Sequence, residues 1–330
     1  MPSSLRHAAR AVALYAGLLL VGTSTWAQTD PAATYPTRTI KIVVGFAAGG
    51  GNDIIARIVG QKLQEELGQT VIIENKPGAN GSLSVLSVMS APADGYTLLV
   101  GASGAMSIVP AVSAKPPYDT LKEFAPISMV ASYPLILSVY SSHPAKNLKE
   151  LVAWLKANPD KANYATSSVA FTLATELFKL RSGAPGTAIP YKSSNESLVS
   201  VIGQQALFTI ADPPPTTPQV KGGQVRALAV TADERMEDLP DVPTMAEGGV
   251  NGVKVGLWSG LFARAGTPPG IVKKLEVTVR RILQMSDVKE KFRAIATPTI
   301  GSTADEFARS VATETKMWGE VGRTANIKLE

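Results

Sequence analysis

The sequence of 330 residues contains no cysteine and only two histidines, His7 and His143. The absence of cysteine excludes disulfides, thiolate zinc sites, iron–sulfur clusters and cysteine nucleophiles. Two histidines are too few for a site that needs several imidazoles, and His143 stands in a polar, proline-containing loop that we expect to face solvent. Aromatic residues make up only 6% and the basic residues are scattered, so no nucleic-acid partner is expected.

Patterns typical of catalysis are also missing. The segment 101–104 (GASG) lacks the spacing of a Gly-x-Ser-x-Gly nucleophile elbow. The glycine-rich segment 45–53 (GFAAGGGND) is not followed by the Lys-Ser/Thr of a phosphate-binding loop, nor does it have dinucleotide-fingerprint spacing. The sequence therefore predicts no catalytic residues, no metal site and no cofactor.

The N-terminus is typical of an exported protein. Arg6 and Arg10 precede an apolar run at 11–21, which is shorter than the roughly 18–20 residues of a membrane-spanning helix. Thr25-Trp26-Ala27 then forms a small-x-small pattern. We predict a signal peptide over 1–27, cleaved after Ala27, and a periplasmic protein. Loss of the two arginines would lower the net charge from +5 to +3. An uncleaved anchor is the alternative.

The rest of the chain alternates strand and helix patterns. Strands are predicted at 39–46, 71–74, 97–100, 127–140, 163–166, 188–191, 207–211, 225–230 and 253–262. Helices are predicted at 52–67, 82–89, 147–157, 169–180, 194–202, 270–285 and 303–321. Strand–loop–helix units of this kind indicate mainly parallel sheets covered by helices.

Two such α/β blocks follow one another, and the second interrupts the first. We assign 28–127 plus 257–330 to domain I and 128–256 to domain II, so that the chain crosses between them twice. Two extended crossings are typical of a two-strand hinge, and a cleft between two domains is a common place for a ligand.

Loops at the ends of the predicted strands are the candidate site. In the first loop, small residues and a helix N-terminus present backbone N–H groups that suit an anion, although a plain tight turn fits equally well. The candidate residues of that loop are Phe46, Ala48, Gly49, Gly50, Asn52 and Asp53. Ser103 belongs to a similar but weaker glycine loop.

Domain II contributes hydroxyl and charged candidates. Thr166, Ser167 and Ser168 stand at a helix start, where they could bind a carboxylate or only cap the helix. Lys192 could bind an anion or be a solvated surface lysine. Asp212, before a run of three prolines, could accept a ligand donor or only set a turn.

Several segments resemble, in order, the Bug-type receptors, the solute-binding proteins of tripartite tricarboxylate transporters. The resemblance begins at Tyr35-Pro36 and the segment 43–57, and it extends over nearly all of the mature chain. Its further segments are Leu67-Gly68-Gln69, Glu74-Asn75-Lys76-Pro77-Gly78, Asp94-Gly95-Tyr96, Tyr118-Asp119, Pro190-Tyr191-Lys192, Arg226-Ala227-Leu228-Ala229-Val230, Val242-Pro243-Thr244 and Ala265-Gly266-Thr267-Pro268. The resemblance implies a two-domain, type II periplasmic-binding-protein fold that closes on a small organic carboxylate and delivers it to membrane transporter subunits.

The resemblance also implies that backbone amides of 46–53 and 166–170 hold the carboxylate. The sequence departs from the family at both loops, with Ala48 in place of a proline and no histidine after 166–173. Phe46 and Phe171 could then form an apolar wall, which favours an aromatic carboxylate or a dicarboxylate over citrate. We expect a monomer. A ligand sensor that signals to a membrane receptor is the alternative function, and a periplasmic enzyme is less favoured.

Overall fold

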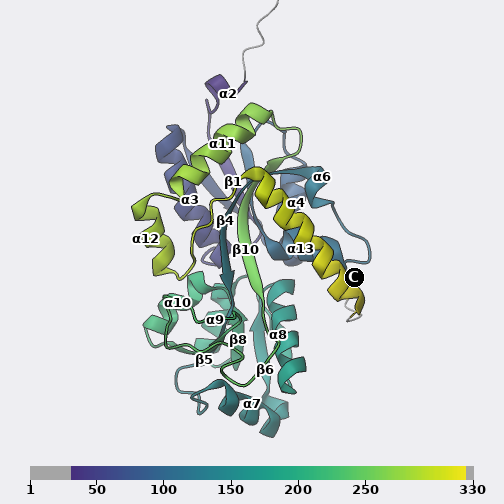
Figure 1. The fold of residues 1–330 in the computed structure, drawn as a ribbon, viewed down its shortest axis with the longest axis vertical. Helices are drawn as coiled ribbons and strands as arrows, with labels where there is room; N and C mark the ends of the chain where they lie inside the picture. Colours follow the sequence, from purple (N-terminus) through teal and green to yellow (C-terminus); the bar gives the residue numbers. More distant parts are fainter. Residues whose placement is uncertain (1–30, 325–330) are drawn as a thin grey trace, which may run out of the picture.

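The computed structural model describes residues 31–324, so the predicted signal peptide lies outside the described residues. Two five-stranded sheets, each flanked by helices, lie at opposite ends of an elongated molecule (Figure 1). Strands β4 (Phe124–Pro134) and β10 (Gly256–Arg264) run along the middle of the view. The predicted two-domain α/β architecture is confirmed, whereas the boundaries at 127/128 and 256/257 stay a prediction.

The first sheet has the order β2-β1-β3-β10-β4, in which only β10 is antiparallel to its neighbours. Its other strands are β1 (Ile40–Val44), β2 (Val71–Asn75) and β3 (Thr97–Ala102). Buried β-branched residues alternate between its faces, with Ile42 in one apolar cluster and Val43 in another. One face is covered by α3 (Gly51–Leu67) and α11 (Pro269–Ile282), the other by α4 (Ser82–Met89), α5 (Val109–Val112) and α13 (Ala304–Thr324).

The second sheet has the order β7-β6-β8-β5-β9, and β5 is its single antiparallel strand. Its strands are β5 (Ile136–Tyr140), β6 (Asn163–Thr166), β7 (Thr187–Pro190), β8 (Phe208–Ala211) and β9 (Val225–Val230). The helices around it are α7 (Leu148–Ala157), α8 (Val169–Ser182), α9 (Ser194–Ile202) and α10 (Pro213–Lys221). Both sheets are mainly parallel, as predicted.

The remaining helices are short or peripheral. They are α2 (Pro31–Thr34), η1 (Ala79–Gly81), η2 (Gly104–Ile108), α6 (Thr120–Glu123), η3 (Pro159–Lys161) and α12 (Ser286–Ala294). Within residues 31–324, no helix is long and apolar enough to cross a bilayer.

The two sheets are joined where β4 continues into β5 and where the chain returns to β10. Thr231, just after β9, contacts both crossings. Its hydroxyl accepts a hydrogen bond from the N–H of Leu135 at 2.8 Å and donates one to the carbonyl of Val255 at 2.7 Å. Its backbone N–H and carbonyl bond the same two residues. One buried threonine therefore ties both crossing segments to the end of β9.

Local signals account for several helix ends. The Asn147 side chain accepts a hydrogen bond from the N–H of Glu150, as the predicted capping box requires. Helix α3 ends at Gly68, which has the left-handed conformation that glycine favours. Helix α9 has the predicted bounds.

Three local predictions are corrected. A helix, α10, begins directly at Pro213, because proline is compatible with the first turn, where no N–H is needed. The predicted glycine loop 101–104 instead runs from β3 straight into η2. The helix predicted over 270–285 ends at Ile282, and a separate α12 follows.

The expectation that His143 faces solvent is wrong. Its side chain is buried between the rings of Tyr140 and Trp154, at centroid distances of 5.0 and 5.1 Å. Burial and then the positive charges of Arg226 and Lys146 lower the pKa of His143, so the ring is held in its neutral form.

Candidate functional site

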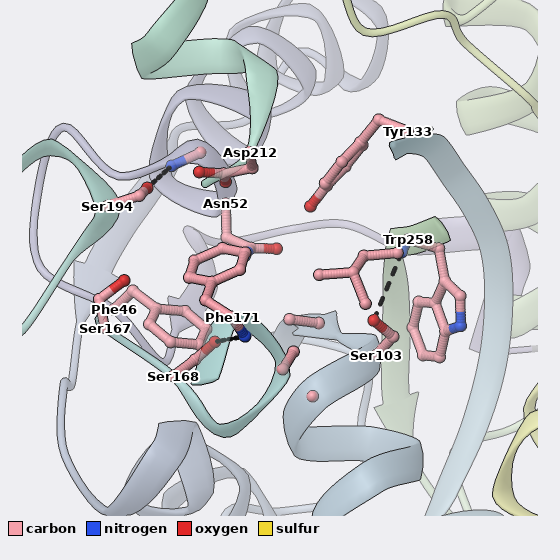
Figure 2. Close-up of a pocket in the computed structure, with 15 residues that line it drawn as sticks. Phe46, Asn52, Ser103, Tyr133, Ser167, Ser168, Phe171, Ser194, Asp212 and Trp258 are labelled. Atoms are coloured by element: carbon pink, nitrogen blue, oxygen red, sulfur yellow. Dashed lines mark hydrogen bonds between the residues drawn. The ribbon is translucent and has the colours of Figure 1, made fainter. Parts of the chain in front are cut away.

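A cavity lies between the two sheets, and both contribute to its lining (Figure 2). The lining combines hydroxyl groups, small residues and aromatic rings with a single carboxyl group. From the first sheet and its helices come Phe46, Gly51, Asn52, Ala102, Ser103, Gly104, Tyr133, Leu257 and Trp258. From the second come Ser167, Ser168, Ala170, Phe171, Ser194 and Asp212.

The N-terminus of α3 meets the second domain at this cavity. The N–H of Gly51 donates a hydrogen bond to the hydroxyl of Ser194 at 3.4 Å. A Cβ atom on Gly51 would lie only 1.7 Å from Oδ2 of Asp212. Only glycine therefore allows the two domains to approach this closely.

Asp53 positions the loop rather than the ligand. Its carboxylate accepts hydrogen bonds of 2.9 Å from the N–H of Gly49, from Nε of Arg57 and from Nδ2 of Asn75. Burial alone would raise the pKa of Asp53, but the bonds from Arg57, Gly49 and Asn75 outweigh it and lower the pKa below its usual value. Asn75 also donates to the carbonyl of Phe46, which fixes the start of the loop.

A buried network orients the polar groups beside α3. Ser259 on β10 donates a hydrogen bond from its hydroxyl to Oδ1 of Asn52 at 2.7 Å. The hydroxyl of Tyr133 on β4 lies 3.0 Å from the hydroxyl of Ser259. Because the amide oxygen of Asn52 is occupied, its amide nitrogen is the group left to donate into the cavity.

The N-terminus of α8 forms the second polar side. The hydroxyl of Ser168 caps this helix by accepting from the N–H of Phe171 at 3.4 Å, and Asn80 of the first domain accepts from the N–H of Val169 at 3.0 Å. The N–H of Ala170 lies in the first turn, where no acceptor exists within the helix. The buried hydroxyl of Ser167 has no hydrogen-bond partner among residues 31–324.

Asp212 is the charged residue of the lining. It directly follows β8, is 1% exposed, and stands before the three prolines that open α10. Because proline has no N–H, the first turn cannot cap the carboxyl group. Neither carboxyl oxygen has a hydrogen-bond partner in the described part of the chain. Burial raises the pKa of Asp212 to about 6, and the nearby hydroxyl of Ser194 offsets part of the rise.

Aromatic residues complete the walls. Phe46 and Phe171, predicted as an apolar wall, both line the cavity, together with Tyr133 and Trp258. The indole of Trp258 packs edge-on against Phe307 at 4.9 Å between centroids. Its Nε1 donates to Glu314, and burial raises the pKa of that glutamate.

The structure brings half of the predicted site residues together and separates the others. The cavity is lined by Phe46, Asn52, Ser103, Ser167, Ser168 and Asp212. Thr166 and Lys192 line an adjoining cavity, which shares Phe46, Ser167 and Ser168. Ala48, Gly49, Gly50 and Asp53 line neither of these cavities, and Gly49 and Gly50 approach Asn195 and Ser193 of the second domain instead.

Sequence reasoning missed several lining residues. Tyr133, Leu257 and Trp258 lie within long strands, and they reach the cavity because β4 and β10 pair over their whole lengths. At Ser194 the sequence predicts only the start of a helix. Among residues 31–324, no group of three or more histidine, aspartate or glutamate side chains is placed to hold a metal ion.

Two mainly parallel sheets that enclose a polar and aromatic cavity define a two-domain solute-binding protein. The profile of the tripartite tricarboxylate transporter family receptor matches residues 55–327. The chain is 34% identical over 319 residues to Protein BugT of Bordetella pertussis, covering 94% of this chain and 97% of that protein. The chain therefore belongs to the tripartite tricarboxylate transporter receptor family, as the resemblance implied.

Solved structures of similar proteins agree with this family assignment. The periplasmic binding protein BugD matches with a TM-score of 0.85 and 31% identity, over 90% of this chain and 100% of that chain. An R. palustris protein solved with adipate matches with a TM-score of 0.85 and 34% identity, over 89% and 99%. MatC from Rhodopseudomonas palustris, solved with bound malate, matches with a TM-score of 0.82 and 32% identity, over 87% and 99%.

Proposed function

We propose that this protein captures a small organic carboxylate in the cavity between its domains and delivers it to the membrane subunits of a tripartite tricarboxylate-type transporter. The observation that carries the proposal is the first turn of α8 at the cavity. There, Ala170, whose N–H lies in the first turn of the helix, and Ser167, whose hydroxyl has no partner among residues 31–324, both line the cavity and offer donors to an anion. Adipate and malate, bound to similar proteins, are both carboxylates.

We further propose that the chain acts in the periplasm after removal of residues 1–27, as a monomer, and that it releases its ligand unchanged. Closure of the domains would bury the ligand and create the surface that the membrane subunits bind. The contacts between Gly51 and Ser194 and between Asn80 and Val169 would then be contacts of the closed form.

A thermal-shift screen tests the carboxylate. The protein is unfolded and refolded to remove carried-over ligand, and it is screened against mono-, di-, tri- and aromatic carboxylates with neutral sugars as controls. At 100 times its dissociation constant a ligand stabilises by about 2.7 kcal/mol, which raises the melting temperature by several degrees at roughly 2–4 °C per kcal/mol. A shift with sugars and with no carboxylate would overturn the proposal.

Matched variants test whether the thermal shift comes from binding in the cavity. Ser167→Ala is expected to reduce it, because it removes a donor that faces the ligand. Ser142→Ala, in an exposed turn after β5, is the control and leaves it unchanged. Proton NMR of the mixture after incubation checks for turnover, and a new product would revive the enzyme alternative.

A further inference from the structure

The cavity contains one charged side chain among its described lining residues, the carboxyl group of Asp212. This group is buried, and within residues 31–324 its oxygens have no partner at hydrogen-bond geometry, although the hydroxyl of Ser194 lies nearby. An ionised carboxylate in such a place is unfavourable unless a partner compensates its charge. A partner that the protein does not provide can come with the ligand.

The prolines after Asp212 explain why the group remains unsatisfied. An aspartate at a helix N-cap ordinarily accepts hydrogen bonds from the second or third N–H of the helix. In α10 these positions are Pro214 and Pro215, which have no N–H. The first turn of α10 therefore gives the carboxylate no N–H partner, and Asp212 is one of the residues that line the cavity, beside Gly51 and Ser194 (Figure 2).

The surroundings of Asp212 suit a positive charge. Aromatic rings of Tyr133, Phe46, Phe171 and Trp258 line the same cavity, and aromatic faces attract cations. Tyr133 is the other titratable group of the lining, and burial raises the pKa of its phenol, so that it stays neutral. The hydroxyl of Ser194 lies beside the carboxylate and lowers the pKa of Asp212, which favours its charged form.

The donors for a ligand carboxylate lie at a different place. In Figure 2, Asp212 and Tyr133 are at the top of the view, whereas Ser168 and Phe171 at the start of α8 are below them. A ligand with carboxylates alone would place its negative charges in one small cavity with that of Asp212. A ligand with a carboxylate and one positive group could place the carboxylate at the start of α8 and the positive group beside Asp212.

We propose that the ligand of this cavity is a carboxylate that also carries a cationic nitrogen, and that the nitrogen donates its hydrogen bonds to Asp212. The inference rests on the proposed function and narrows its ligand class. Charge-assisted hydrogen bonds of this kind are among the strong ones, and aromatic side chains would cover the rest of the cation.

The test compares ligands that differ only in the nitrogen. Calorimetric titrations at about pH 7.5 measure the affinity for adipate and 2-aminoadipate, for 3-phenylpropanoate and phenylalanine, and for each carboxylate found in the screen with its amino counterpart. In at least one pair, the amino member is expected to bind tighter by a factor of about ten or more, the size of a charge-assisted hydrogen bond.

Asp212→Asn is the matched variant, since it keeps the shape of the side chain and removes its charge. It is expected to abolish the preference for the amino member. Asp160→Asn, at an exposed carboxyl group in η3, is the control and keeps that preference. Circular dichroism and a melting curve of each variant show that it is folded.

The outcomes separate this inference from the proposed function. If carboxylates without nitrogen bind as tightly as their amino counterparts, or if Asp212→Asn retains the preference, the inference is wrong and the carboxylate function stands. Binding of plain carboxylates that strengthens from about pH 7.5 to pH 5.5 would also overturn it, because Asp212 would then act as a protonated donor. If no member of either kind binds, both proposals fail.

Discussion

Gly51 at the start of α3 offers a sharp test of how the domains meet. Replacement by alanine adds a Cβ atom that would lie 1.7 Å from Oδ2 and 2.6 Å from Cγ of Asp212. Ordinary contacts between such atoms are near 3.4 Å or longer, so either the carboxyl group of Asp212 must turn away or the second domain must shift. The collision involves two domains, and it therefore acts on the closed arrangement.

The expected cost follows from overpacking in proteins. Forcing extra atoms into a well-packed contact costs about 1–3 kcal/mol, which corresponds to a ligand affinity lower by about 5- to 150-fold. The stability of the ligand-free protein should not fall together with the ligand affinity. Alanine is the better helix former by up to about 1 kcal/mol, and separated domains would relieve the clash.

Two measurements on Gly51→Ala check this reasoning. Calorimetry with the carboxylate that gives the largest thermal shift measures affinity, and a melting curve without ligand measures stability. Gly256→Ala is the control, because its added Cβ has nothing within 4 Å. A Gly51→Ala protein that binds as tightly as the unmodified protein would refute the closed contact between Gly51 and Asp212.

Three further predictions concern the crossing, the domain contact and pH. Thr231→Val should lower the free energy of unfolding by about 1–3 kcal/mol, since it leaves a buried N–H and carbonyl unpaired. Urea unfolding measures this loss, and Thr231→Ser is compared because serine keeps the hydroxyl. A Thr231→Ser protein that is destabilised as much as Thr231→Val would contradict a role for the hydroxyl. Asn80→Gly should weaken ligand binding by about 2- to 10-fold with little change in the ligand-free melting temperature, because it removes the bond to Val169 between the domains and glycine tolerates the left-handed conformation of residue 80; unchanged affinity would contradict it. His143 has a lowered pKa when folded, so its contribution is complete above its usual pKa of about 6.5 and is lost as the pH falls below it. The stability measured at pH 5 relative to pH 7.5 should therefore fall less in His143→Phe, and an equal fall would show that His143 is not responsible.

Local patterns were sufficient for most of the fold. Helix α9 has the predicted bounds because Ser193 caps it and Gly203 ends it, and both signals are adjacent to the helix in sequence. Apart from the long β4 and β10, the strands of both sheets are short, largely apolar runs, which is the pattern typical of buried parallel strands. Helix α10 was missed because a proline run indicates a turn, although the first turn of a helix tolerates it.

The site was only partly predictable, because its residues meet through tertiary contacts. Ser167 and Asp212 follow strand ends, and such positions converge at the carboxyl edge of a parallel sheet. Tyr133 and Trp258 reach the cavity only through the pairing of β4 with β10, which no local pattern specifies. Gly49 and Gly50 had the composition of a ligand loop, but their neighbours are residues of the other domain.

The place of β10 in the first sheet has a consequence for the order in which the chain can fold during synthesis. This strand lies between β3 and β4, which do not pair with each other within the described sheets, and it comes from residues 256–264. The whole second sheet is encoded before it. The domain whose synthesis begins first is therefore the last to be completed, and until β10 emerges β3 and β4 each keep an unpaired edge. The first domain therefore completes its sheet only after the whole second sheet has been synthesised.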